Sequence, residues 1–273
     1  MKFAICNEMF KDWEWERVVA CAAALGYHGV EIAPFTLADR ATDVTAERRA
    51  QLRRAAEKAG VAVVGLHWLL VKPPGLYVTH TDPGIRRRTA DYFIDLVRLC
   101  SDLGGRLMVI GSPKQRNLLP GITRERAMGY ACEVFGRALP EAERCGVTLA
   151  IEPLTPRETD FINTAADGVE LIRRLDHPRF RLHLDVKAMS GSEKEPVPDV
   201  IRKNAEFLHH FHSNDPNLLG PGMGEVDHRP ILKALKDVNY KGYVSVEVFD
   251  YRPGAEHIAR RSLNYLKQVE AAA

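Results

Sequence analysis

The sequence has 273 residues, of which 45% are hydrophobic and 27% are charged, and its formal net charge is +2. This composition is that of an ordinary globular chain, long enough for one large α/β domain. The small net charge gives no electrostatic case for binding nucleic acid or a membrane, and no run of about 18 apolar residues predicts a membrane-spanning helix.

Short apolar runs alternate with longer amphipathic runs from one end of the chain to the other. The apolar runs predict strands over residues 3–7, 29–33, 61–69, 106–111, 147–154, 180–185, 208–214 and 242–249. The amphipathic runs between and after them predict helices over 14–25, 45–59, 82–103, 123–145, 164–175, 198–207, 227–238 and 254–270. Pro140 is expected to kink the fourth helix or to split it in two.

This order of elements predicts a parallel sheet, because each strand is followed by a helix. An open doubly wound sheet satisfies the same alternation. Eight units favour closure into a (β/α)8 TIM barrel, and the first strand is not followed by the glycine-rich phosphate loop of a dinucleotide fold. We therefore expect one TIM-barrel domain over residues 1–273.

The cysteines and the N-terminus bear on the compartment. The five cysteines are odd in number and form no CxxC pair, which is typical of reduced thiols. Residues 1–6 are too short and too polar in their flanks for a signal peptide. Both features predict a cytoplasmic protein.

Four consecutive predicted strands each carry one acidic or imidazole group near their C-terminal ends, where a barrel places its active site. These groups are Glu152, Asp185, His212 and Glu247, which are 33, 27 and 35 residues apart. Converging carboxylates repel one another unless a cation lies between them. Three oxygen donors and one imidazole predict one divalent metal, with Mn²⁺ best suited and Mg²⁺ or Co²⁺ as alternatives. His210 has the same inward parity as His212 and could exchange roles with it.

Several other polar or aromatic residues at the same rim are candidates for binding a substrate. His67 and Trp68 end the third strand and either stack on a sugar or line the core. Lys114 and Arg116 follow the fourth strand and either hold a phosphate or carboxylate or are simply solvated. The remaining candidates are Asn7, Glu8 and Asn214.

The C-terminal half of the chain resembles a known family in its motifs. The segments Ile151-Glu152-Pro153-Leu154, Leu184-Asp185, His210-Phe211-His212 and Val246-Glu247 are similar to the metal-ligand strands of the ketose 3-epimerase, hydroxypyruvate isomerase and fructoselysine epimerase group of the xylose-isomerase-like superfamily. The likeness extends to Glu158, to 162–164 and to 222–227. It implies that Glu152 and Glu247 are both ligands and the acid/base pair, that Asp185 and His212 are ligands only, and that Glu158 lies near the end of the substrate.

The chemistry that this implies is proton transfer next to a ketone. A metal that binds a ketone and a neighbouring hydroxyl acidifies the C–H between them and stabilises the resulting enediolate. Return of the proton to the opposite face gives an epimer, and return to the adjacent carbon gives an isomer. Loss of a β-substituent makes the enzyme a lyase or dehydratase, for example on a 3-keto-glycoside or keto-inositol.

Two readings from other classes are weaker. Endonuclease-IV-type phosphodiesterases share the barrel but need more histidines and a basic face. The other alternative is a barrel that binds a ligand without catalysis. We expect a small-molecule sugar as the partner, with neither nucleic acid nor membrane. Barrels of this type are often homodimers or homotetramers.

The sequence departs from the epimerase pattern at two positions. Ala188 stands where those enzymes have a histidine, and Leu218 stands where they have an arginine. A changed substrate is therefore expected. On an extended strand, Lys187 would point inward like Asp185 and could replace the histidine, with the substrate or Glu158 as its anion. If the strand ends at Asp185, Lys187 would simply point into water.

Overall fold

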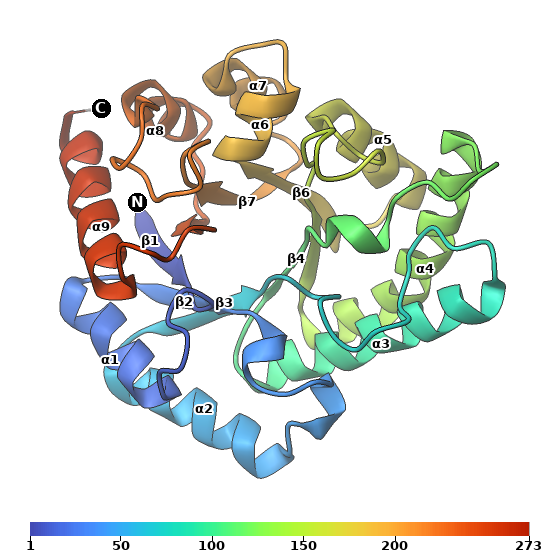
Figure 1. Ribbon diagram of the computed structural model, residues 1–273, viewed down its shortest axis with the longest axis horizontal. Helices are drawn as coiled ribbons and strands as arrows, with labels where there is room; N and C mark the ends of the chain where they lie inside the picture. The colour runs from blue at the N-terminus through green and yellow to red at the C-terminus, as the bar shows by residue number, and fades with distance from the viewer. Residues whose placement is uncertain (273) are drawn as a thin grey trace.

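The computed structural model describes residues 1–272, and eight parallel strands lie at its centre (Figure 1). They pair in chain order, and β8 pairs with β1, so the sheet is a closed barrel. The strands are β1 (Lys2–Cys6), β2 (Gly29–Ile32), β3 (Ala62–Leu66), β4 (Leu107–Ile110), β5 (Thr148–Ile151), β6 (Phe180–Asp185), β7 (Leu208–Ser213) and β8 (Tyr243–Val246). The predicted TIM barrel is confirmed.

Helices surround this barrel (Figure 1). Their apolar faces are buried against it. They are α1 (Trp15–Leu25), α2 (Ala46–Ala59), α3 (Pro83–Asp102), α4 (Arg124–Cys145), α5 (Ala165–Leu175), α6 (Val186–Ser192), α7 (Val197–Lys203), α8 (His228–Asp237) and α9 (Ala255–Ala272). Short 3-10 turns η1 (Pro34–Thr36), η2 (Ala41–Asp43) and η3 (Pro113–Gln115) lie in the loops.

The helix ends follow local chemistry that the sequence displays. Thr45 and Thr123 accept hydrogen bonds from the first-turn amides of α2 and α4. Gly60 and Gly146 adopt left-handed backbone conformations just beyond the same helices, with φ of 78° and 67°. Such caps fix where each helix stops and the chain turns back into the next strand.

The helices differ from the predicted ones in two places. Pro140 was expected to kink the fourth helix or to split it, and α4 is not split, because buried Leu139 and Ala142 hold that turn against the core while the proline ring faces solvent. The helix predicted over 198–207 is α7, four residues shorter at its end, and an additional helix, α6, begins directly after Asp185. The carboxylate of Asp185 caps α6 by accepting from the Ala188 amide at 2.7 Å.

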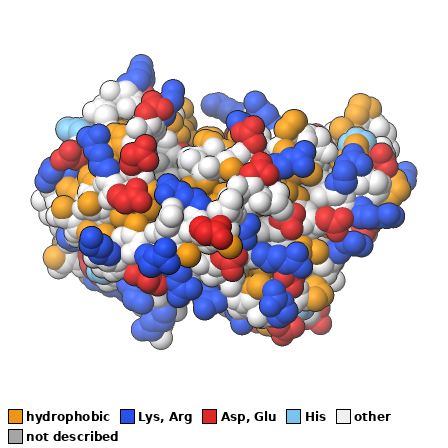
Figure 2. Space-filling view, turned by 90° about the horizontal axis from the view of Figure 1, so that it is seen from below, with side chains coloured by type: hydrophobic (Ala, Val, Ile, Leu, Met, Phe, Trp, Pro, Cys, Tyr) orange, Lys and Arg blue, Asp and Glu red, His pale blue; other side chains and the backbone are white. Residues whose placement is uncertain are grey.

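The predicted strands over 61–69, 147–154 and 242–249 were too long. In each case the residues beyond the paired strand turn over the barrel rim, where the apolar pattern continues because the loops are also buried. Within residues 1–272, no helix is long and apolar enough to cross a membrane. On the face seen in Figure 2, basic and acidic side chains are interspersed.

Candidate functional site

The four predicted metal ligands lie at the C-terminal rim of the barrel on neighbouring strands. Asp185 ends β6 and His212 is in β7, and the two residues are register partners. Glu152 and Glu247 follow β5 and β8 directly. All four side chains are buried, with exposed fractions of 0–6%. The strand spacing therefore brings them to one end of the barrel, as predicted.

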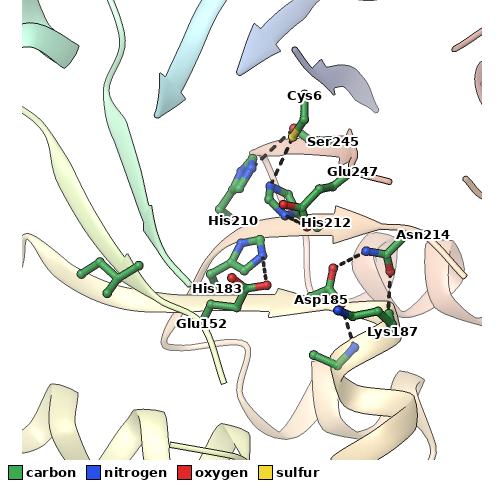
Figure 3. Close-up of polar contacts among 12 residues, drawn as sticks. Cys6, Glu152, His183, Asp185, Lys187, His210, His212, Asn214, Ser245 and Glu247 are labelled. Carbon is green, nitrogen blue, oxygen red and sulfur yellow. Dashed lines mark hydrogen bonds and ion pairs between the residues drawn. The ribbon is translucent and has the colours of Figure 1, made fainter. Parts of the chain in front are cut away.

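These groups form two connected clusters rather than one. Ligand atoms of Glu152, Asp185 and His212, together with one from His183, lie within 4.8 Å of one another. Glu247 is next to this cluster, with its Oε2 3.1 Å from His212 Nδ1 (Figure 3). Its ligand atom also lies within 4.8 Å of those of Glu8 and His67. The donor set thus fits a divalent cation at the first cluster, with Glu247 at its edge.

The buried carboxylates at this rim perturb one another's pKa values. Burial, and then the charges of Glu247 and Asp185, raise the pKa of Glu152 well above its ordinary value. Burial also raises the pKa of Asp185, to about 6. Burial alone would raise the pKa of Glu247 too, but His212 and His67 lower it to about 2. A cation among these carboxylates would relieve their mutual repulsion.

His212 is fixed in place by a carboxylate that the sequence analysis did not identify. Glu31, fully buried on β2, contacts His212 Nε2 at 3.1 Å and His210 Nε2 at 2.6 Å. This contact leaves His212 Nδ1 facing Glu247 and gives His210 a partner of its own. His210 is therefore part of the support for His212. One charged residue in the otherwise apolar run 29–33 was the available signal.

A cavity of about 480 Å³ opens above the carboxylates. Glu152 and Glu247 line it together with Trp68, Lys114, Glu158, Lys187 and Phe249. Trp68 donates from its indole nitrogen to Glu247 Oε1 at 2.8 Å, and its ring stacks on Phe249 with centroids 6.1 Å apart. The cavity thus joins two carboxylates to an apolar aromatic wall.

Each of the two expectations for Lys187 was correct on one point and wrong on the other. β6 ends at Asp185, as the second expected, but the side chain of Lys187 is buried beside Glu158, as the first expected. Lys187 is in the first turn of α6 rather than on a strand, because Asp185 caps that helix. Its side chain does not point into water: it is only 8% exposed, its Nζ is 2.8 Å from Glu158 Oε1 and it lies 4.0 Å from the centre of the Phe249 ring. The structure thus places Lys187 in the cavity, paired with the carboxylate named as its partner.

The other substrate-binding candidates divide into cavity residues and supports. Lys114 is exposed at the cavity wall, whereas Arg116 is buried and donates to the carbonyls of Ile110 and Ile162. Asn214 donates to Asp185 Oδ2 at 2.5 Å and accepts from the Lys187 amide at 2.8 Å.

The candidates on the first and third strands also serve as supports. Asn7 binds the Ala33 amide and Thr36 beside η1. His67 is fully buried and binds Glu8 at 2.6 Å. Arg116, Asn214, His67 and Asn7 therefore hold the rim rather than face the cavity.

The chain is similar in sequence to proteins of known family. A family model described as a xylose isomerase-like TIM barrel matches residues 19–269. The D-psicose 3-epimerase of Enterocloster bolteae is 27% identical over 258 residues, which cover 89% of this chain and 80% of that protein. The D-psicose 3-epimerase of Ruminiclostridium cellulolyticum is 29% identical over 170 residues, covering 62% of this chain and 58% of that protein.

Solved structures show the same fold. A D-psicose 3-epimerase from Clostridium cellulolyticum, determined with D-tagatose, superimposes with a TM-score of 0.87 at 23% identity over 99% of both chains. A 3-keto-D-glucoside 4-epimerase from E. coli superimposes with a TM-score of 0.82 at 19% identity, also over 99% of both chains.

Proposed function

The chain belongs to the xylose isomerase-like TIM-barrel family, and from this we propose that it is a divalent-metal-dependent isomerase or epimerase of a small keto-sugar. The observation that carries the proposal is the position of Glu152 and Glu247. Both line one cavity, beside the cluster whose donors fit a cation. The names of the relatives, which are ketose 3-epimerases, support the same reaction class.

In this proposal the residues have distinct roles. Glu152, Asp185, His212 and Glu247 would hold the cation, and Mn²⁺, Mg²⁺ and Co²⁺ are the candidates. When bound, the cation would polarise the substrate ketone and stabilise the enediolate formed on proton loss. Glu152 and Glu247, on β5 and β8, would exchange the substrate proton. Asp185 and His212 would be ligands only.

The remaining cavity residues would bind and orient the sugar. Lys187, held against Glu158, offers an ammonium to a substrate oxygen at the place where the family's histidine is replaced by Ala188. Trp68 and Phe249 offer an apolar face to the ring. The predicted cytoplasmic location and homo-oligomeric state stay predictions.

A lyase or dehydratase acting on a 3-keto-glycoside is the second candidate. It would use the same proton abstraction and differ only in expelling a β-substituent. The stacked pair of Trp68 and Phe249 favours it, because an aromatic wall at the cavity suits the added apolar surface of a glycoside. Mass analysis of the products separates the two candidates, since only the lyase changes the substrate's mass by loss of a group.

Isotope exchange tests the proposal before the substrate is known. The metal-loaded protein would be incubated in D₂O with a panel of ketohexoses, ketopentoses and 3-keto-glycosides. Deuterium should enter at a carbon next to the ketone. Glu152→Gln and Glu247→Gln should each abolish turnover, and at least one should lose exchange by about 10²-fold or more, the usual size of an acid–base contribution.

The matched control is Glu206→Gln, an exposed glutamate just before β7 and thus at the opposite end of the barrel. It should exchange at the wild-type rate. Exchange that persists in full in both site variants would show that another residue is the base. A wild-type protein that exchanges no member of the panel would refute the proposed reaction class.

A further inference from the structure

His183 lies among the predicted metal ligands but has no role in the function proposed above. It is on β6, two residues before Asp185, so both side chains point into the barrel. Its register partner is His210, while that of Asp185 is His212. His183 therefore lies one layer below the rim, beside Glu152 and His212 (Figure 3).

The imidazole of His183 is fully buried and lacks a hydrogen-bond partner on either nitrogen among residues 1–272. The carboxylate nearest to it is Glu152, whose Oε1 lies 3.7 Å from Nε2, beyond hydrogen-bond distance. By contrast, His210 and His212 both contact Glu31. Leaving a buried polar group unpaired costs about 1–3 kcal/mol, so a bound partner at this ring would be stabilising.

The geometry of the surrounding donors identifies that partner. Ligand atoms of His183, Glu152, Asp185 and His212 all lie within 4.8 Å of one another. Ligand bonds to first-row divalent metals are about 2.0–2.3 Å, so two donors on opposite sides of one ion lie at most about 4.6 Å apart. A small inward movement of these side chains would therefore bring all four onto a single ion.

We propose that His183 is an additional metal ligand, which gives the site two imidazoles and a preference for Co²⁺ over Mn²⁺ and Mg²⁺. The inference rests on the metal dependence proposed above and refines which metal the site selects. Imidazole nitrogen favours the later first-row metals, whereas carboxylate-rich sites suit Mg²⁺ and Mn²⁺. The family resemblance implies one histidine ligand, His212. The second, His183, is inferred from its position in the structure.

Counting nitrogen ligands tests the proposal without any substrate. Pulsed EPR of the full-length protein loaded with Mn²⁺, with its histidines labelled with ¹⁵N, should show two directly coordinated imidazoles in the wild type and one in His183→Leu. A wild-type protein with one coordinated imidazole would overturn the inference. This count in the wild type decides the question even if the variant does not fold.

Binding titrations of the metal-free protein add a second, independent measurement. His183→Leu should weaken Co²⁺ binding by about 10²-fold and Mn²⁺ binding by about 10-fold, within the range seen for loss of metal-supporting groups. The control is His228→Leu, which removes another fully buried imidazole with an unpartnered nitrogen, on α8 and outside the cluster. It should leave both affinities within about twofold of the wild type.

The possible results separate this inference from the proposed function. If the wild type binds metal through one imidazole and still exchanges substrate protons, only the role of His183 is wrong. If the wild type binds neither Co²⁺ nor Mn²⁺, both proposals fail. Equal loss of Co²⁺ and Mn²⁺ affinity in His183→Leu would overturn the claimed preference for Co²⁺.

Discussion

Replacing Gly111 by alanine should damage the metal site while leaving the barrel intact. Gly111 follows β4 and packs against Glu152, so a methyl group there would lie 2.2 Å from Glu152 Oε2. Ordinary carbon–oxygen contacts are longer by about 1 Å, so the carboxylate must move by about that distance. A metal ligand tolerates displacements of only about 0.2 Å. Gly111→Ala should therefore remove Glu152 from the ligand set.

The expected magnitude follows from the loss of one ligand. Mutating a residue that only hydrogen-bonds to a metal ligand lowers metal affinity by about 10–100-fold. Losing a carboxylate that is itself a ligand should therefore lower the affinity by at least about 100-fold. The free energy of unfolding should change far less, because the carboxylate can turn into the cavity that it lines.

Isothermal titration of the metal-free protein with Co²⁺ and Mn²⁺ measures this effect, with thermal unfolding as a check on the fold. The matched control is Gly129→Ala on α4, where an added methyl group meets nothing within 4 Å. It should leave metal binding unchanged and stabilise the protein by up to about 1 kcal/mol. A folded Gly111→Ala protein that binds metal within twofold of the wild type would show that Glu152 is not a ligand.

Three further changes have outcomes fixed by the structure. Lys187→Met should lower kcat/KM by about 10²-fold with metal still bound, because it removes the ammonium paired with Glu158 in the cavity. A change within twofold would show that Lys187 has no role in turnover. Gly65→Ala should lower the free energy of unfolding, measured in urea, by about 3 kcal/mol or more, because the added methyl group would lie 2.1 Å from the Leu107 carbonyl oxygen on β4. A decrease in the free energy of unfolding below about 1 kcal/mol would contradict this. Hydrogen bonds from Arg144 and Arg98 lower the pKa of Glu141 from 4.5 to about 2. The ionised carboxylate therefore stabilises the fold above pH 4.5, and this stabilisation is lost as the pH falls toward 2. Glu141→Gln should therefore cost about 0.5–1 kcal/mol at pH 7 and less at pH 3, and an equal cost at both would refute the assignment.

Local patterns in the sequence were enough to predict the barrel and the position of its polar rim. Period-2 and period-3.6 apolar patterns are local, so they marked eight strand–helix units without knowledge of the packing. Because parallel strands end at the same edge of a barrel, Glu152, Asp185, His212 and Glu247 could be placed together from spacing alone. The boundaries were less certain where buried loops continued an apolar run, as after β3, β5 and β8.

The contacts that support those rim residues could not be predicted from the sequence, because they join distant strands. Glu31 contacts His212 across 181 residues of sequence, and that pairing depends on how β2 and β7 face each other inside the barrel. The sequence left open whether Lys187 continued the strand or lay beyond its end, and the structure answers this because Asp185 caps α6, which begins directly after it. The isolation of the His183 ring is likewise a property of the packed interior, because whether a buried nitrogen has a partner is set by neighbours from distant strands.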